Sequence, residues 1–176
     1  MSVAKHPGRE YAEFLMSRKA SYLGKDVIRD TSVFVQIMER TSSFEEIDWP
    51  RPKTLLCLLL PDTVPVPPET GLWRRALDHG VASIGMFGHS GEVWHDSFDE
   101  FAQPYYERGT PVVVSVFDTL VGPDALVGIV DCVFSAMQPV DEYLHELAST
   151  LFVWVGGSHA DEARLQGVLA SRLASS

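Results

Sequence analysis

Three residues that hydrolases use as a catalytic set follow predicted strands in the order Ser90, Asp118, His159. A serine can act as the nucleophile, a histidine as the base that takes its proton, and an aspartate as the group that orients the histidine. This chain order is that of the α/β-hydrolases. The residues therefore support the hypothesis of a small serine hydrolase that acts at the C-terminal ends of the strands.

The residues around Ser90 match the hydrolase motif incompletely. That motif reads Gly-x-Ser-x-Gly, because two glycines relieve crowding in a strained turn. Here Gly88-His89-Ser90-Gly91-Glu92 has a glutamate in place of the second glycine. Residues 1–80 also supply fewer strands before the serine than such enzymes have. Strand ends commonly carry serine, aspartate and histidine, so ordinary turn chemistry explains the same residues.

A second group with chemical potential is the acidic stretch after this turn. His95 and Asp99 are four residues apart, and Asp96 and Glu100 repeat that spacing. On a helix each pair would share a face and could offer ligands to a cation. Carboxylates in a first helical turn have a simpler role, since they interact favourably with the helix dipole. No second histidine-rich segment accompanies them, and we expect no metal.

A third candidate is the segment from Trp154 to Asp161, where two glycines lead from a predicted strand into a helix. Helix N-termini bind anions. However, the chain contains neither the dinucleotide-binding glycine pattern nor the P-loop pattern. Asp161 and Glu162 would also repel a phosphate. We expect no cofactor.

The other polar residues near strand ends are predicted to form a binding surface, because ligands of open parallel sheets bind at the carboxyl ends of the strands. Trp94 stands in a polar stretch and is predicted to be an exposed anchor for an interface or pocket. The predicted binding residues are Asp62, His89, Trp94, His95, Asp96 and Asp99.

Alternating strands and helices must position these residues. Short apolar runs predict strands over 54–60, 81–87, 111–117 and 151–155. Helices are expected over 67–79, 97–106, 123–137 and 158–173; Ser97 with Glu100 and Ser158 with Asp161 have the spacing of capping boxes. The alternation predicts an α/β three-layer sandwich of the flavodoxin- or Rossmann-like kind, with a mainly parallel sheet of about four strands.

The residues before this pattern are predicted to form a separate unit. We expect an N-terminal helical extension and linker over 1–52 and an α/β domain over 53–176. Aromatic and apolar residues recur every three to four positions from Gly8 to Leu23, which predicts a helix. Residues 25–40 fit either a helix or, from Val33, a strand.

Several short sequence features occur together. The predicted helical segment 69–80 is followed by Phe87-Gly88 after the second predicted strand, and then by His95-Asp96 and Asp99. The sequence Trp-Val-Gly-Gly begins at Trp154. In these features the chain resembles a family of small bacterial α/β proteins known as a domain of unknown function. The resemblance spans residues 53–173. It implies the α/β fold and draws attention to His95-Asp96.

Charge and hydropathy exclude several classes of protein. The net charge is −10, and the chain has no long cluster of lysine and arginine, which argues against nucleic-acid binding. The longest apolar run, Leu55–Leu60, is too short to cross a bilayer, and no signal-like segment opens the chain. Cys57 and Cys132 stand in apolar runs, as free thiols of a reducing compartment do. We expect a cytoplasmic protein.

Two hypotheses about function follow. The favoured one is a non-catalytic accessory factor, of an immunity or regulatory type, that binds another protein. An acidic surface attracts a basic partner, and no catalytic motif in the chain is complete. The alternative is the serine hydrolase built on Ser90, Asp118 and His159.

Overall fold

The architecture is that of a computed structural model, which describes residues 19–38, 47–50, 53–60, 71–107, 113–117, 125–139, 141–143 and 145–175. These residues form one six-stranded sheet in the order β1-β2-β6-β3-β4-β5. Its strands are β1 (Ser21–Asp26), β2 (Thr31–Met38), β3 (Thr54–Leu59), β4 (Ser83–Phe87), β5 (Val113–Phe117) and β6 (Ser149–Val155). The α-helices are α1 (Gly71–Asp78), α2 (Gly91–Tyr106), α3 (Ala125–Ser135) and α4 (His159–Ala174), and a short 3-10 helix covers Asp141–Tyr143.

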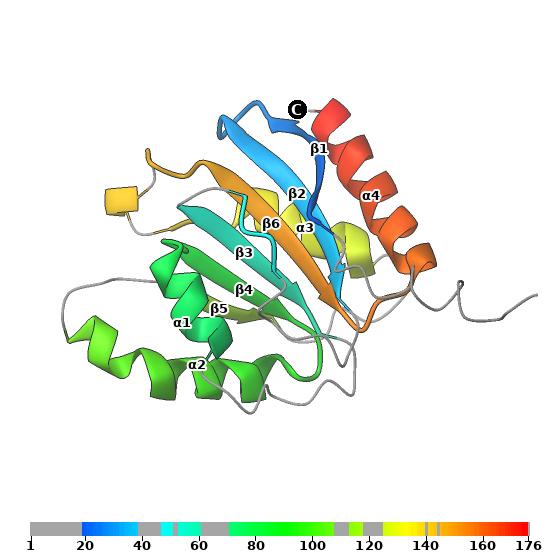
Figure 1. Ribbon diagram of the computed structural model, residues 1–176. Coiled ribbons are helices and arrows are strands. Elements are labelled where there is room, and N and C mark those ends of the chain that lie inside the picture. The colour runs from blue at the N-terminus through cyan, green and yellow to red at the C-terminus, as the bar shows by residue number, and fades with distance from the viewer. Residues whose placement is uncertain are drawn as a thin grey trace, which may run out of the picture.

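The sheet is mainly parallel and lies between two helical layers (Figure 1). Five strands run in parallel, and β1 pairs antiparallel with β2 at one edge. Helices α1 and α2 pack on one face, and α3 and α4 pack on the other. The prediction of an α/β fold with a mainly parallel sheet is therefore confirmed. The flavodoxin- or Rossmann-like assignment stays a prediction.

The central strand β3 shows why the chain needs helices on both faces. All six of its residues are buried. Leu56 and Leu58 join the core under α1 and α2, whereas Leu55 and Cys57 join the core under α3 and α4. A continuous apolar run is the pattern of a strand covered on both sides, so the predicted strand over 54–60 is confirmed. Its cysteine is a free thiol, and burial raises the pKa of Cys57.

The helix predicted from Gly8 to Leu23 was wrong at its C-terminal end, because Ser21–Leu23 belong to β1. Of the two alternatives left open for residues 25–40, the structure has the strand, β2. The sheet therefore has two more strands than expected, and residues on both sides of the expected boundary at residue 52 share it. The reason is long-range pairing, because β2 pairs with β6 from Ser32–Ser149 to Met38–Val155. Residues 1–18, which hold most of the predicted helix, lie outside the described residues.

The start of α2 was also predicted wrongly. The helix begins at Gly91, not near residue 97, and Ser90 takes the N-cap position. Gly91, Trp94, Phe98 and Ala102 form a buried stripe at helical spacing, which carries the helix upstream of the expected start. The other helices were predicted within a few residues, and α4 has the expected capping box between Ser158 and Asp161.

An arginine in the β1–β2 turn joins this hairpin to α3. The Arg29 guanidinium donates hydrogen bonds to the backbone carbonyls of Val133, Phe134 and Met137 at 2.9, 2.8 and 3.0 Å. It also lies 4.0 Å from the carboxylate of Asp26, which is almost fully buried. Burial lowers the pKa of Arg29, and the carboxylate of Asp26 opposes that shift. A cation at the C-terminus of a helix satisfies carbonyls that have no partner within the helix.

Candidate functional site

The carboxyl edge of the sheet holds the described residues predicted from the serine motif. The turn after β4 contains Gly88, His89 and Ser90, and the turn after β6 leads from Gly156 to His159. Strand β6 lies between β2 and β3, so the connections reverse direction between β3 and β6. Such a reversal is where open α/β sheets bind ligands. Asp62 and Asp118, which follow β3 and β5, lie outside the described residues.

Close packing of backbone against backbone shapes the turn after β4. Gly88 has φ of +121°, and a Cβ at this position would lie 1.9 Å from the carbonyl oxygen of Leu60. The Leu60 amide donates a 2.8 Å hydrogen bond to the carbonyl of Phe87, and the Gly91 amide donates one of 2.9 Å to the carbonyl of Gly88. Only glycine fits this position, so the first glycine of the serine motif has a structural reason.

Ser90 stands at the start of α2, with its backbone in the bridge region next to the helical one. Its φ and ψ are −84° and −1°, values that the third residue of a type I turn also takes. Its side chain makes no capping hydrogen bond to the first turn of α2, all of which the structure describes. A nucleophile elbow instead holds its serine in a strained turn. Ser90 has a negative φ, so its backbone lacks left-handed strain, and the neighbouring His89 is exposed.

The proposed base of the triad is turned toward its own helix. His159 opens α4 with 75% of its side chain exposed, and its Nδ1 lies 3.8 Å from the carboxylate of Glu162. Strand β3 separates β4 from β6, which puts the strands before Ser90 and His159 about 10 Å apart. The strand order gives no support to direct contact between these two residues. The triad therefore stays a prediction.

Trp94 is not the exposed anchor that the sequence suggested. It is fully buried in the core under α1 and α2. Its ring meets Trp73 edge-on with centroids 5.8 Å apart, and Trp73 meets Phe98 in the same way at 5.2 Å. The prediction was wrong because α2 begins earlier than expected, which places Trp94 on the buried stripe. Its role is packing.

His95, Asp96 and Asp99 are brought together on the exposed side of α2. His95 Nδ1 lies 3.7 Å from a carboxylate oxygen of each aspartate. The exposed side-chain fractions are 30% for His95, 87% for Asp96 and 50% for Asp99. In the part of the chain that the structure describes, no three His, Cys, Asp or Glu residues are grouped so that they could hold a metal ion. Exposed carboxylates of this kind can pair with cationic side chains of another molecule.

The structure adds further carboxylates to this surface. We name the set the acidic face of α2, and its exposed members are Glu92, Asp96, Asp99, Glu100 and Glu107. Residues 91–107 contain no lysine or arginine. The side chains of Val93 and Tyr106 beside the face are 58% and 39% exposed. Burial, and then the charge of Asp99, raises the pKa of Tyr106.

The sequence contains a signal for this face that is visible only with the true start of α2. Positions 92, 96, 99, 100 and 107 fall on one side of a helix that starts at residue 91. With a start near residue 97, Glu92 lies outside the helix and the row is broken. Correct placement of the N-cap at Ser90 would have revealed the acidic face.

Comparison of the chain with protein-family models, with curated proteins and with solved structures gives no match in any of the three searches. The resemblance carried by Phe87-Gly88 and His95-Asp96 therefore stays a prediction. Among the described residues, no helix has the length and apolar character needed to span a membrane.

Proposed function

We propose that the protein is a non-catalytic accessory factor that binds a basic protein through the acidic face of α2. The observation that carries the proposal is the set of five exposed carboxylates on one side of a helix whose residues 91–107 include no lysine or arginine. A regulatory or immunity-type role is the class of function that such binding would serve.

The energetics of α2 support a role beyond the stability of the helix. Glu92 and Asp96, and Asp96 and Glu100, are like charges four residues apart, and each such pair costs about 0.2–0.5 kcal/mol. Glu107 occupies the C-cap, where a negative charge opposes the helix dipole at a cost of about 0.3–1 kcal/mol. Glu92 in the first turn offsets part of these costs through the helix dipole, but no basic residue in the last turn does so. Cationic side chains of a partner would relieve the repulsion.

Exposed apolar groups beside the carboxylates complete an interface of ordinary composition. Val93 and Tyr106 are large hydrophobic side chains that remain exposed on α2. Protein interfaces combine apolar or aromatic contacts with a polar rim. Charge would then guide the basic partner to this surface, and the apolar contacts would hold it there.

The hydrolase alternative receives no comparable support. Of its three residues, Ser90 has the backbone of a turn residue, His159 contacts Glu162, and Asp118 lies outside the described residues. No described feature favours catalysis over binding at this edge of the sheet.

The proposal is tested by affinity purification of the tagged protein from a lysate of its own cells, at low and at high salt. We expect one basic protein in near-stoichiometric amount that is released by high salt, because screening weakens exposed charge pairs. The Asp96→Asn, Asp99→Asn, Glu100→Gln triple variant should lose this partner.

A matched control removes the same number of charges elsewhere. Asp30, Asp78 and Asp141 are exposed residues outside α2, and their replacement by asparagine changes the net charge by the same amount. This control should retain the partner. Retention of the partner by the α2 variant, or its equal loss from both variants, would show that the acidic face does not bind it.

A further inference from the structure

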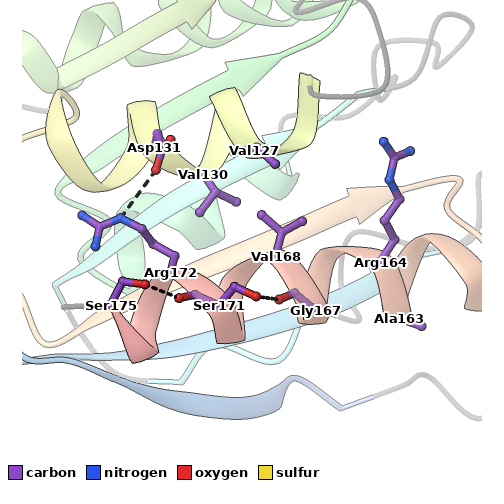
Figure 2. Close-up of a pocket in the computed structure, with 10 residues that line it drawn as sticks. All are labelled: Val127, Val130, Asp131, Ala163, Arg164, Gly167, Val168, Ser171, Arg172 and Ser175. Carbon is purple, nitrogen blue, oxygen red and sulfur yellow. Dashed lines mark hydrogen bonds and ion pairs between the residues drawn. The ribbon is translucent and has the colours of Figure 1, made fainter.

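The β1–β2 hairpin is covered unequally on its two faces. On one face α4 lies over both strands, and Val33 of β2 is 0% exposed. Helix α4 also packs beside α3, where Nε of Arg172 lies 3.5 Å from the Asp131 carboxylate (Figure 2). On the other face, Tyr22 of β1 is 60% exposed and its strand partner Phe34 is partly exposed. Helix α2, which lies on that side, contacts β4 and β5 instead (Figure 1), so the described residues cover this face of the hairpin only in part.

We name the side chains on this second side the hairpin face, and they are Tyr22, Lys25, Ser32 and Phe34. The rings of Tyr22 and Phe34 contact each other, with their centroids 5.5 Å apart. The solvated face of an antiparallel strand pair normally carries polar side chains, whereas the hairpin face has two aromatic rings at its centre. Its composition is that of a surface on which another apolar element packs.

The chain that precedes β1 reaches the sheet on the side of the hairpin face. The described residues begin at Lys19, and Ala20 packs against the core under α1 and α2. The Ala20 amide donates a 3.3 Å hydrogen bond to the carboxylate of Asp48, whose neighbours in the chain belong to the same core. The eighteen residues before Lys19 are therefore joined to the sheet next to the hairpin face.

The sequence of these residues supplies an apolar stripe of suitable length. Tyr11, Phe14 and Leu15 have the spacing of one side of a helix. Since β1 begins at Ser21, the helix predicted for this segment has to end earlier, and we take it as residues 8–18. It would be about 16 Å long, against about 20 Å for the six residues of β1. The two residues left between helix and strand are enough for a connection of this kind.

We propose that residues 8–18 pack on the hairpin face as a helix antiparallel to β1 and complete the second helical layer of the sheet. Counted from the junction of helix and strand, Leu15 and Tyr22 are about 5 and 3 Å away, so they come level with each other. Glu10 and Lys25, which have opposite charges, come level in the same way at about 12 and 13 Å. This contact lies within the chain and is separate from the acidic face of α2, so it goes beyond the proposed binding function.

Hydroxyl-radical footprinting of the full chain, read by mass spectrometry, tests the proposal without any substitution. Tyr106 is the internal reference, because it is the same type of residue and is 39% exposed, against 60% for Tyr22. If residues 8–18 cover the hairpin face, Tyr22 should be oxidised several-fold less than Tyr106. Oxidation of Tyr22 that equals or exceeds that of Tyr106, as the two exposed fractions alone predict, would overturn the proposal.

Two aspartate substitutions then identify the segment that covers the face. Phe14→Asp places a charge on the side of the predicted helix that faces Tyr22 and should raise the oxidation of Tyr22 several-fold, with folding checked by circular dichroism. Met16→Asp is the matched control, because Met16 lies on the opposite side of the predicted helix, and it should leave Tyr22 protected. Protection that survives Phe14→Asp would assign the hairpin face to another occupant, such as a second copy of the chain. That result, or equal effects of the two substitutions, would overturn the proposal.

Discussion

Replacement of Arg29 by methionine tests how the β1–β2 hairpin is held to the rest of the fold. The side chain is 15% exposed and donates three hydrogen bonds to carbonyls at and just beyond the end of α3. Methionine keeps the length and apolar character of the stem but removes every donor. It also removes the cation beside Asp26, whose carboxylate keeps a 3.0 Å hydrogen bond from the Ile28 amide.

The size of the effect follows from two losses and one opposing gain. Hydrogen bonds that involve a charged group contribute about 1.5–3 kcal/mol each, but they do not add, and the carbonyls regain some water. Removing one partner of a buried pair leaves an uncompensated charge at a cost of about 3–5 kcal/mol. Release of the buried guanidinium from its desolvation offsets part of this loss. We therefore expect Arg29→Met to lower the free energy of unfolding by about 3 kcal/mol, with a fall in Tm of about 6–12 °C for a chain of this size.

The assay is urea unfolding at one fixed protein concentration, followed by tryptophan fluorescence and far-UV circular dichroism. Lys25→Met is the matched control, because Lys25 lies in the same hairpin and pairs with Asp30 at an exposed site. Exposed pairs contribute about 0–1 kcal/mol, so the control should stay near the wild type. Arg29→Lys should fall between the two, since an ammonium cannot serve three carbonyls from one planar fork. Equal stabilities of Arg29→Met and Lys25→Met would refute the reasoning.

Three further changes test single features of the structure. Gly88→Ala should lower the free energy of unfolding by about 3 kcal/mol or more in a urea titration, because its Cβ would collide with the Leu60 carbonyl; a near-neutral effect would contradict the turn geometry. Hydrogen bonds from the Ser158 side chain and backbone lower the pKa of Asp161 in the folded state, so this carboxylate stabilises the fold at neutral pH and ceases to do so as the pH falls through that lowered value. Asp161→Asn should therefore cost about 1 kcal/mol at neutral pH and less in acid, and a pH-independent difference in Tm would count against the capping box. For Ser90, a fluorophosphonate probe should label wild type and Ser90→Ala alike, whereas labelling confined to the wild type would revive the hydrolase hypothesis.

Local patterns in the sequence were enough to predict much of the α/β body. The strand over 54–60 is a continuous apolar run because both faces of β3 are covered, and this pattern is visible without knowing its neighbours. The capping box at Ser158 and Asp161 was predictable from the sequence in the same way, because its hydrogen bonds join residues only three positions apart. The acidic composition of residues 91–107 is also evident from the sequence. Placing these carboxylates on one exposed side of α2 requires the true start of the helix.

The remaining features depend on partners that are far away along the chain. Residues 21–38 enter the sheet because β2 pairs with β6, where Ser32 meets Ser149, and no window around Ser32 contains that partner. The burial of Trp94 depends on Trp73 on another helix, and α3 and α4 contact each other although β6 separates them along the chain. Insertion of β6 between β2 and β3 separates the strands before Ser90 and His159, which chain order cannot show. Local hydrogen bonds and side-chain periodicity are properties of short segments, whereas strand order and burial result from the packing of the whole chain.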